Sequence, residues 1–263
     1  EGKPVIIAAG IEQGFKITAA QLEKAITPNS RMFVINSPSN PSGAVYTLDE
    51  LKAIGEVLRK HPRILIATDD MYEHILLSDD KFVNILNACP DLYPRTIVLN
   101  GVSKAYAMTG WRIGYCGGPE AIITAMENIQ SQSTSNPTSI SQVAAETALT
   151  GDQACIVPMV TAFKERNRYV TDKLNAMPGV RCLSAGGAFY AFADTRQAIG
   201  NLHAKGVLKD GSDIAFSEYL LEQGGVAVVP GSAFGSEGYI RLSFATSMSN
   251  LENALKRIGK ALA

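Results

Sequence analysis

The sequence predicts an α/β fold, in which a mostly parallel sheet carries helices on both faces and a small α+β domain follows it. Through the first two thirds of the chain, short apolar runs alternate with amphipathic helical segments, an order typical of parallel strands joined by right-handed crossovers. From about residue 175 the pattern changes to short strands and turns, which favours a separate α+β unit. We expect a large domain over residues 1–165 and a small domain over residues 166–263.

The elements follow from this pattern in order. Thr18 with Gln21, and Thr47 with Glu50, have the form of capping boxes, which open helices by satisfying free main-chain amides. In the large domain the sequence predicts strands at 4–9, 31–36, 63–68, 95–99 and 112–117, and helices at 18–26, 48–60, 120–130, 139–149 and 157–174. In the small domain it predicts strands at 180–183, 188–193, 226–229 and 239–244, and helices at 212–223 and 250–262.

The composition excludes several classes of protein. A chain of 263 residues with 46% hydrophobic residues can bury a large core. A formal net charge of -1 gives no reason to expect nucleic acid or a membrane surface as a partner, and the longest apolar runs are only strand-sized. The four cysteines are dispersed, without a CxxC pair or a nearby histidine. We therefore expect no metal site, free thiols and a cytoplasmic location.

A lysine stands directly after the predicted strand at 95–99, in the pair Ser103 and Lys104. In an open α/β sheet, ligands bind beyond the carboxyl ends of the strands, and a partly desolvated lysine there can lose its proton and capture a carbonyl group. Arg112 follows eight residues later and supplies a planar fork that suits a phosphate. Together these residues point to an aldehyde that carries a phosphate.

Three more polar residues follow predicted strands. Asn40 comes after the strand at 31–36, and Asp69 and Tyr72 come after the strand at 63–68. Because the carboxyl ends of parallel strands meet at one edge of a sheet, we expect these side chains in the same crevice as Lys104.

The pair Ser103-Lys104, followed by Met108-Thr109-Gly110-Trp111-Arg112-Ile113-Gly114, resembles the cofactor-lysine motif of the fold type I pyridoxal phosphate enzymes. The match is to the class I/II aminotransferases, and it is closest to the bacterial branch of aspartate aminotransferases. The resemblance implies pyridoxal 5'-phosphate bound as a Schiff base on Lys104, with Asp69 pairing with the ring nitrogen. It also implies that Asn40 and Tyr72 bind the phenolic oxygen, Ser103 and Arg112 the phosphate, and Arg241 the substrate α-carboxylate.

The resemblance extends from about Pro4 to the last residue and implies a further N-terminal segment of roughly a hundred residues or more, a typical length for part of a domain. That segment would carry a glycine-rich phosphate loop, an aromatic residue that stacks on the ring and a lysine that reads a distal carboxylate. Singly, each site residue has an ordinary explanation, such as an exposed lysine or arginine, a helix-capping aspartate or a turn asparagine. Only their joint occurrence at the family spacing favours a site.

The function that the resemblance implies is transfer of an amino group from L-aspartate to 2-oxoglutarate in a homodimer. Its partners would be a small amino acid and a 2-oxo acid, with no nucleic acid and no membrane. An aminotransferase with an aromatic or alanine-type substrate, or an eliminating relative, stays open. A further alternative is the aminotransferase-like effector domain of a transcriptional regulator, which would follow a DNA-binding helix-turn-helix.

Overall fold

The computed structural model describes residues 2–263, which divide into two compact units. The parallel-sheet unit consists of Thr18–Pro38 and Val45–Val160, and the C-terminal unit consists of the residues up to Ile17, Ser39–Ala44 and Thr161–Ala263. The sequence analysis sets one boundary after residue 165. The compact units differ from that division because the first residues and the short segment Ser39–Ala44 pack with the C-terminal half.

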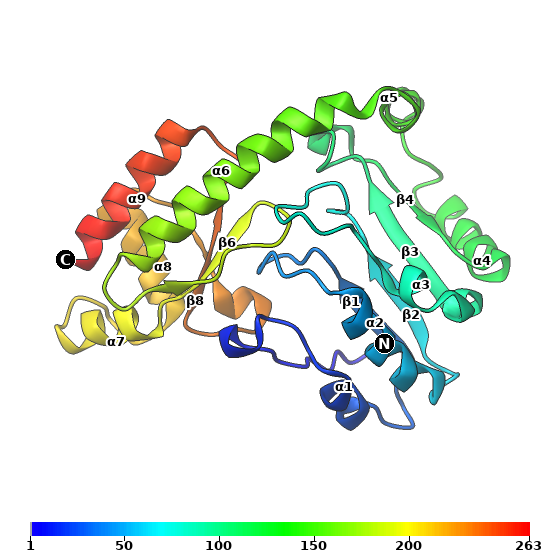
Figure 1. The fold of residues 1–263 in the computed structure, drawn as a ribbon, viewed down its shortest axis with the longest axis horizontal. Coiled ribbons are helices and arrows are strands. Elements are labelled where there is room, and N and C mark those ends of the chain that lie inside the picture. The colour runs from blue at the N-terminus through cyan, green and yellow to red at the C-terminus, as the bar shows by residue number, and fades with distance from the viewer. Residues whose placement is uncertain (1) are drawn as a thin grey trace. The chain divides into compact units, whose positions relative to one another are not determined.

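A four-stranded sheet forms the centre of the parallel-sheet unit (Figure 1). Its order is β1-β2-β3-β4, with β1 at Met32–Asn36, β2 at Leu65–Asp69, β3 at Thr96–Gly101 and β4 at Gly114–Gly117. The first three strands run parallel, as predicted, and β4 pairs antiparallel with β3. The carboxyl ends of β2 and β3 are therefore neighbours at one edge of the sheet.

Both predicted capping boxes are present in this unit. They open α1 (Ala19–Ala25) and α2 (Leu48–Arg59), where the Thr18 and Thr47 hydroxyls accept from the main-chain amides of Gln21 and Glu50. The helix α2 buries Leu51, Ile54, Val57 and Leu58 on one face, so apolar burial fixes its orientation. The remaining elements are α3 (Ile85–Ala88), η2 (Pro90–Arg95), η3 (Thr109–Trp111), α4 (Glu120–Ser131), α5 (Ser139–Thr150) and η4 (Gln153–Cys155).

The C-terminal unit is built on an antiparallel sheet of order β5-β6-β8-β7. Ile11, Phe192 and Tyr239 form an apolar cluster here, with Phe15 and Phe234 packed against it. The strands are β5 (Arg181–Cys182), β6 (Tyr190–Asp194), β7 (Val229–Pro230) and β8 (Tyr239–Ser243). The helices are η1 (Ile11–Gln13), α6 (Ile156–Asn175, entering this unit at Thr161), α7 (Arg196–Ala204), α8 (Asp213–Gly224), η5 (Gly231–Phe234) and α9 (Met248–Leu262).

Several elements differ from the sequence analysis. The strand expected over residues 4–9 does not form: Val5 and Ile6 are 69% and 70% exposed, and the segment pairs with none of the described strands. A β-branched run without a neighbouring strand has no ladder of hydrogen bonds to hold it extended. The sequence analysis predicts neither α3 nor α7, and Gly200 weakens the helical pattern of α7.

None of the helices within residues 2–263 is long and apolar enough to cross a lipid bilayer.

Candidate active site

Asp69 is the last residue of β2 and lies between the neighbouring strands β1 and β3. It is opposite Asn36 in β1 and Leu99 in β3. The Asn36 side-chain amide donates to the Asp69 carbonyl oxygen at 2.9 Å, and the Met71 main-chain amide donates to Asp69 Oδ1 at 3.2 Å. These bonds fix the end of the strand and leave the half-buried Asp69 carboxylate with acceptor capacity for a ligand.

The turn after β2 carries Tyr72 and is held from inside. Asp70 is 1% exposed, and its carboxylate accepts from Thr68 Oγ1 at 2.6 Å and from Asn84 Nδ2 at 2.7 Å. Burial raises the pKa of the Asp70 carboxyl, and the hydrogen bonds from Thr68 and Asn84 offset only part of this effect. Tyr72, two residues further on, is 4% exposed. The turn is thus a rigid support for the tyrosine.

Ser103 and Lys104 lie in a turn that begins directly after β3, and both are half-buried. No side-chain hydrogen bond or ion pair joins Lys104 Nζ to any other residue of 2–263. Arg112 lies on the same connection between β3 and β4, with a left-handed backbone (φ 51°). Its side chain is exposed and donates from Nη1 to the Thr109 carbonyl oxygen at 2.9 Å, so most of its five donors are available to an anion.

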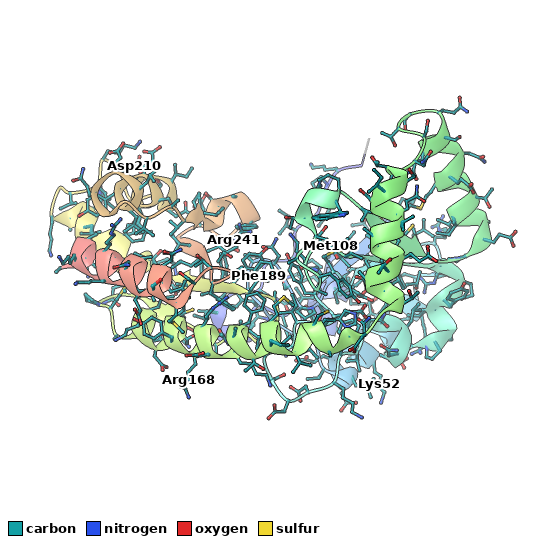
Figure 2. All side chains as sticks on the ribbon, turned by 90° about the horizontal axis from the view of Figure 1, so that it is seen from above. Lys52, Met108, Arg168, Phe189, Asp210 and Arg241 are labelled. Carbon is teal, nitrogen blue, oxygen red and sulfur yellow. The ribbon has the colours of Figure 1, made fainter. Side chains whose placement is uncertain are left out.

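Arg241 lies in β8 of the C-terminal unit and is held on three sides. Its guanidinium carbon is 4.6 Å from the ring centre of Tyr190 and 5.0 Å from that of Phe234, and Nη1 donates to Asn40 Oδ1 at 2.8 Å. Arg241 Nε is buried and has no hydrogen-bond partner among the described residues. Because an unsatisfied buried donor is costly, this arrangement suits an anionic ligand that accepts from Nε. Phe189, labelled with Arg241 in Figure 2, packs on the Tyr190 ring with a distance of 4.7 Å between the ring centres.

The comparisons with known proteins identify the family. The family model described as "Aminotransferase class I and II" matches residues 1–258. The chain belongs to the class I and II aminotransferases. Members of this family use pyridoxal phosphate.

Similar aminotransferases cover nearly all of this chain. The aspartate/prephenate aminotransferase of Nitrosomonas europaea is 71% identical over 262 residues, which are 100% of this chain and 66% of that protein. The crystal structure of the aspartate aminotransferase from Rhizobium meliloti has a TM-score of 0.92 at 45% identity and covers 99% of this chain and 65% of that one. An aromatic aminotransferase from Pyrococcus horikoshii OT3 has a TM-score of 0.90 at 35% identity and covers 99% and 67%. The chain thus spans about two thirds of the aminotransferases that it matches.

The aminotransferase site residues predicted from sequence fall into two groups. Asp69, Tyr72, Ser103, Lys104 and Arg112 belong to the parallel-sheet unit, at or beyond the carboxyl ends of β2 and β3, and Asn40 and Arg241 meet in the C-terminal unit. Their roles stay predictions. A cavity of about 310 Å³ in the parallel-sheet unit contains none of them; it is lined by residues that include Lys60, His61 and Arg63.

Sequence reasoning missed the two rings that hold Arg241, Tyr190 and Phe234. Phe192 in β6 pairs with Arg241 in β8, and Tyr190 lies two residues before Phe192. Because side chains alternate along a strand, Tyr190 and Arg241 share one face of the sheet. This follows only from the strand register, which the sequence does not show. No sequence signal marks Phe234. Within residues 2–263, no group of three His, Cys, Asp or Glu side chains is arranged to hold a metal ion.

Proposed function

We propose that this chain is the greater part of a pyridoxal phosphate-dependent aminotransferase that moves an amino group from L-aspartate to a 2-oxo acid such as 2-oxoglutarate. One observation carries the proposal: the amine of Lys104, which is unpaired among residues 2–263, and the carboxylate of Asp69 lie at or just beyond the carboxyl ends of two neighbouring parallel strands. A strand edge of this kind is where open α/β sheets bind ligands.

The residues present fit the cofactor, as judged by the chemistry of the donor set. Pyridoxal phosphate offers an aldehyde, a ring nitrogen, a phenolic oxygen and a phosphate. Within the part of the chain that the structure describes, Lys104 supplies an amine without a partner, Asp69 a carboxylate with open acceptor sites and Arg112 a guanidinium with free donors. Tyr72 and Asn40 would hold the phenolic oxygen, and Ser103 would join Arg112 on the phosphate.

When bound, the cofactor supplies an electron sink for the bonds of the substrate α-carbon. Asp69 would hold a proton on the ring nitrogen, because a neighbouring carboxylate favours the charged form of a base. Lys104 Nζ would carry the proton between the substrate α-carbon and the C4′ carbon of the cofactor. Tyr72 and Asn40 would donate to the phenolic oxygen and stabilise its negative charge.

Arg241 would bind the α-carboxylate of the substrate. The rings of Tyr190 and Phe234 and the Asn40 side chain restrict the guanidinium, and Nε is left as a donor. A fixed planar fork matches a carboxylate in two parallel hydrogen bonds. The similar proteins from Nitrosomonas europaea and Cereibacter sphaeroides are named aspartate/prephenate aminotransferases, which supports aspartate as a substrate and makes prephenate a second compound to test. The Pyrococcus relative keeps an aromatic substrate as the alternative.

We infer that the complete protein acts as a homodimer in the cytoplasm. Support for association comes from Ile129 on α4 and from Ile140 and Val143 on α5, which are 73%, 76% and 62% exposed, since exposed apolar surface of this kind often marks an interface. Support for the compartment comes from the four free cysteines.

The test uses the complete protein loaded with pyridoxal phosphate. We expect a visible absorption band of the bound cofactor that is lost in Lys104→Ala together with turnover. Lys52→Ala is the matched control, because Lys52 is an exposed lysine of α2 that forms an ion pair with Asp49 (Figure 2). This variant should keep both the absorption band and turnover. Rates with aspartate, phenylalanine and alanine, each with 2-oxoglutarate and with prephenate, assign the substrate. Full turnover in Lys104→Ala would refute the proposal.

A further inference from the structure

A side-chain hydrogen bond links the turn that carries Tyr72 to the end of the strand that leads to Lys104. Asn100 is the residue before the last in β3, and its Nδ2 donates to Glu73 Oε1 at 2.7 Å. The Oδ1 atom of Asn100 accepts from the Gly101 main-chain amide, also at 2.7 Å. The Asn100 side chain therefore uses both ends of its amide group and is fixed in orientation.

Glu73 is rigidly connected to Tyr72 as its neighbour in the turn after β2. The Glu73 main-chain amide donates to the Asp70 carbonyl oxygen at 2.9 Å, and the Ile75 amide donates to the Tyr72 carbonyl oxygen at 2.8 Å. A turn closed by two main-chain bonds moves as one piece. A force on the Glu73 side chain is thus transmitted to Tyr72.

The hydrogen bond between Glu73 and Asn100 lies where β2 and β3 stop pairing. The paired register of β2 and β3 ends at Asp69 and Leu99. The Asp70 main-chain amide still donates to the Leu99 carbonyl oxygen at 2.9 Å, and the two chains then separate. Tyr72 and Lys104 both lie beyond this point, so strand pairing alone does not set their separation. The bond between Glu73 and Asn100 lies beyond the same point and joins the two departing segments.

The bond is of a kind strong enough to hold such a separation. A carboxylate acceptor makes hydrogen bonds about twice as strong as neutral pairs. The Glu73 side chain is only 28% exposed, so water competes weakly. His74 Nε2 is also 3.3 Å from Glu73 Oε1, and the His74 ring packs edge-to-face on Tyr106 with ring centres 6.2 Å apart. That ring contact is weaker than the charge-assisted bond from Asn100, so the bond between Glu73 and Asn100 is the stronger of the two links.

We propose that Glu73 is a positioning residue that, through Asn100, sets the distance between the Tyr72 hydroxyl and the Lys104 amine. This inference rests on the proposed function, because the two groups must act on one bound cofactor. Tyr72 would lower the pH midpoint of the cofactor's absorbance change by stabilising the anionic phenolic oxygen. Loosening the bond would weaken that contact and raise the midpoint.

The direction in which the pH midpoint moves distinguishes a positioning role of Glu73 from an effect of its negative charge. Removing the negative charge of Glu73 by itself would lower the midpoint, because a protonated group loses a favourable neighbour. Asn100→Ala breaks the bond and keeps the charge, so we expect the midpoint to rise by about half a pH unit or more, a fraction of what one charge-assisted hydrogen bond can contribute. Glu73→Gln removes the charge and keeps an acceptor oxygen, so we expect no rise. In a Glu73→Ala background, adding Asn100→Ala should raise the midpoint no further.

The experiment is a pH titration of the cofactor's visible absorbance in the complete protein and these variants, with thermal unfolding as a check on folding. The proposal is overturned if Asn100→Ala titrates like the wild type, if Glu73→Gln rises as far as Asn100→Ala, or if Asn100→Ala has its full effect in the Glu73→Ala background. The last result would assign the effect to the Gly101 amide. A wild-type protein without a cofactor band would instead refute the proposed function, so the two failures are distinguishable.

Discussion

Replacing Arg241 by lysine tests the proposed carboxylate site most directly. Arg241 Nη1 already donates to Asn40 Oδ1 at 2.8 Å. The Nε and Nη2 atoms are therefore left to bind a carboxylate through two hydrogen bonds. Lysine keeps the positive charge but offers a single point of contact. The net loss is one charge-assisted hydrogen bond, worth about 1.5–3 kcal/mol. We therefore expect kcat/KM for aspartate to fall by roughly 10- to 150-fold in Arg241→Lys.

The assay is a steady-state comparison with Arg196→Lys as the matched control. Arg196 also lies in the C-terminal unit beside an aromatic ring, 5.4 Å from the centre of Tyr239, but its Nε and Nη2 are bound to Asp194. It should behave like the wild type. An Arg241→Lys variant within threefold of the wild type, or an equal loss in Arg196→Lys, would show that Arg241 does not bind the substrate carboxylate.

Three further outcomes follow from local structure. Gly43 has φ 67°, and an added Cβ would lie 2.5 Å from Ala185 Cβ and 2.7 Å from the Gly187 oxygen. We therefore expect Gly43→Ala to lower the free energy of unfolding by about 2–4 kcal/mol. Gly14 also has a positive φ, but a Cβ there would meet no atom within 4 Å, so Gly14→Ala should cost only about 1–2 kcal/mol. Equal losses by chemical denaturation would contradict this reasoning. Burial raises the pKa of Asp70 in the folded protein, so ionised Asp70 lowers the free energy of unfolding once the pH exceeds about 4, the pKa of an unfolded aspartate. The free energy of unfolding of Asp70→Asn should thus increase relative to that of the wild type as the pH rises from 4 to 7. A difference between the two proteins that stays constant over this pH range would refute the assignment. Burial also raises the pKa of the Cys182 thiol to about 12, so a thiol reagent at pH 8 should label exposed Cys155 and reach Cys182 only after unfolding, as mass spectrometry can establish.

Local sequence signals predicted the framework of the parallel-sheet unit. Thr18 and Thr47 define their helices through contacts three residues away, and the parallel order of β1, β2 and β3 follows from the alternation of strands and helices. Lys104 and Arg112 were found because both lie on one short connection. Signals of this kind depend on residues that are close together in the sequence, so they can be recognised before the fold is known.

Contacts between distant segments could not be predicted in the same way. Asn40 and Arg241 are 201 residues apart, and nothing near Asn40 indicates that its loop packs with the C-terminal unit. The strand expected at residues 4–9 failed for a related reason: β propensity describes how a residue fits a sheet, and it does not supply the neighbouring strand. Glu73 and Asn100 each resemble ordinary polar residues until the fold brings them together.

The antiparallel reversal at β3 and β4 limits which residues the two ends of its connection can accept. Gly101 pairs with Gly114, and a Cβ at Gly101 would come within 3.2 Å of the Gly114 Cα, so residues 102–113 form a loop closed tightly at its neck. Ser103, Lys104 and Arg112 all lie inside this loop. A bulky residue at either glycine would meet the main chain of the opposite strand and force the loop open at its base.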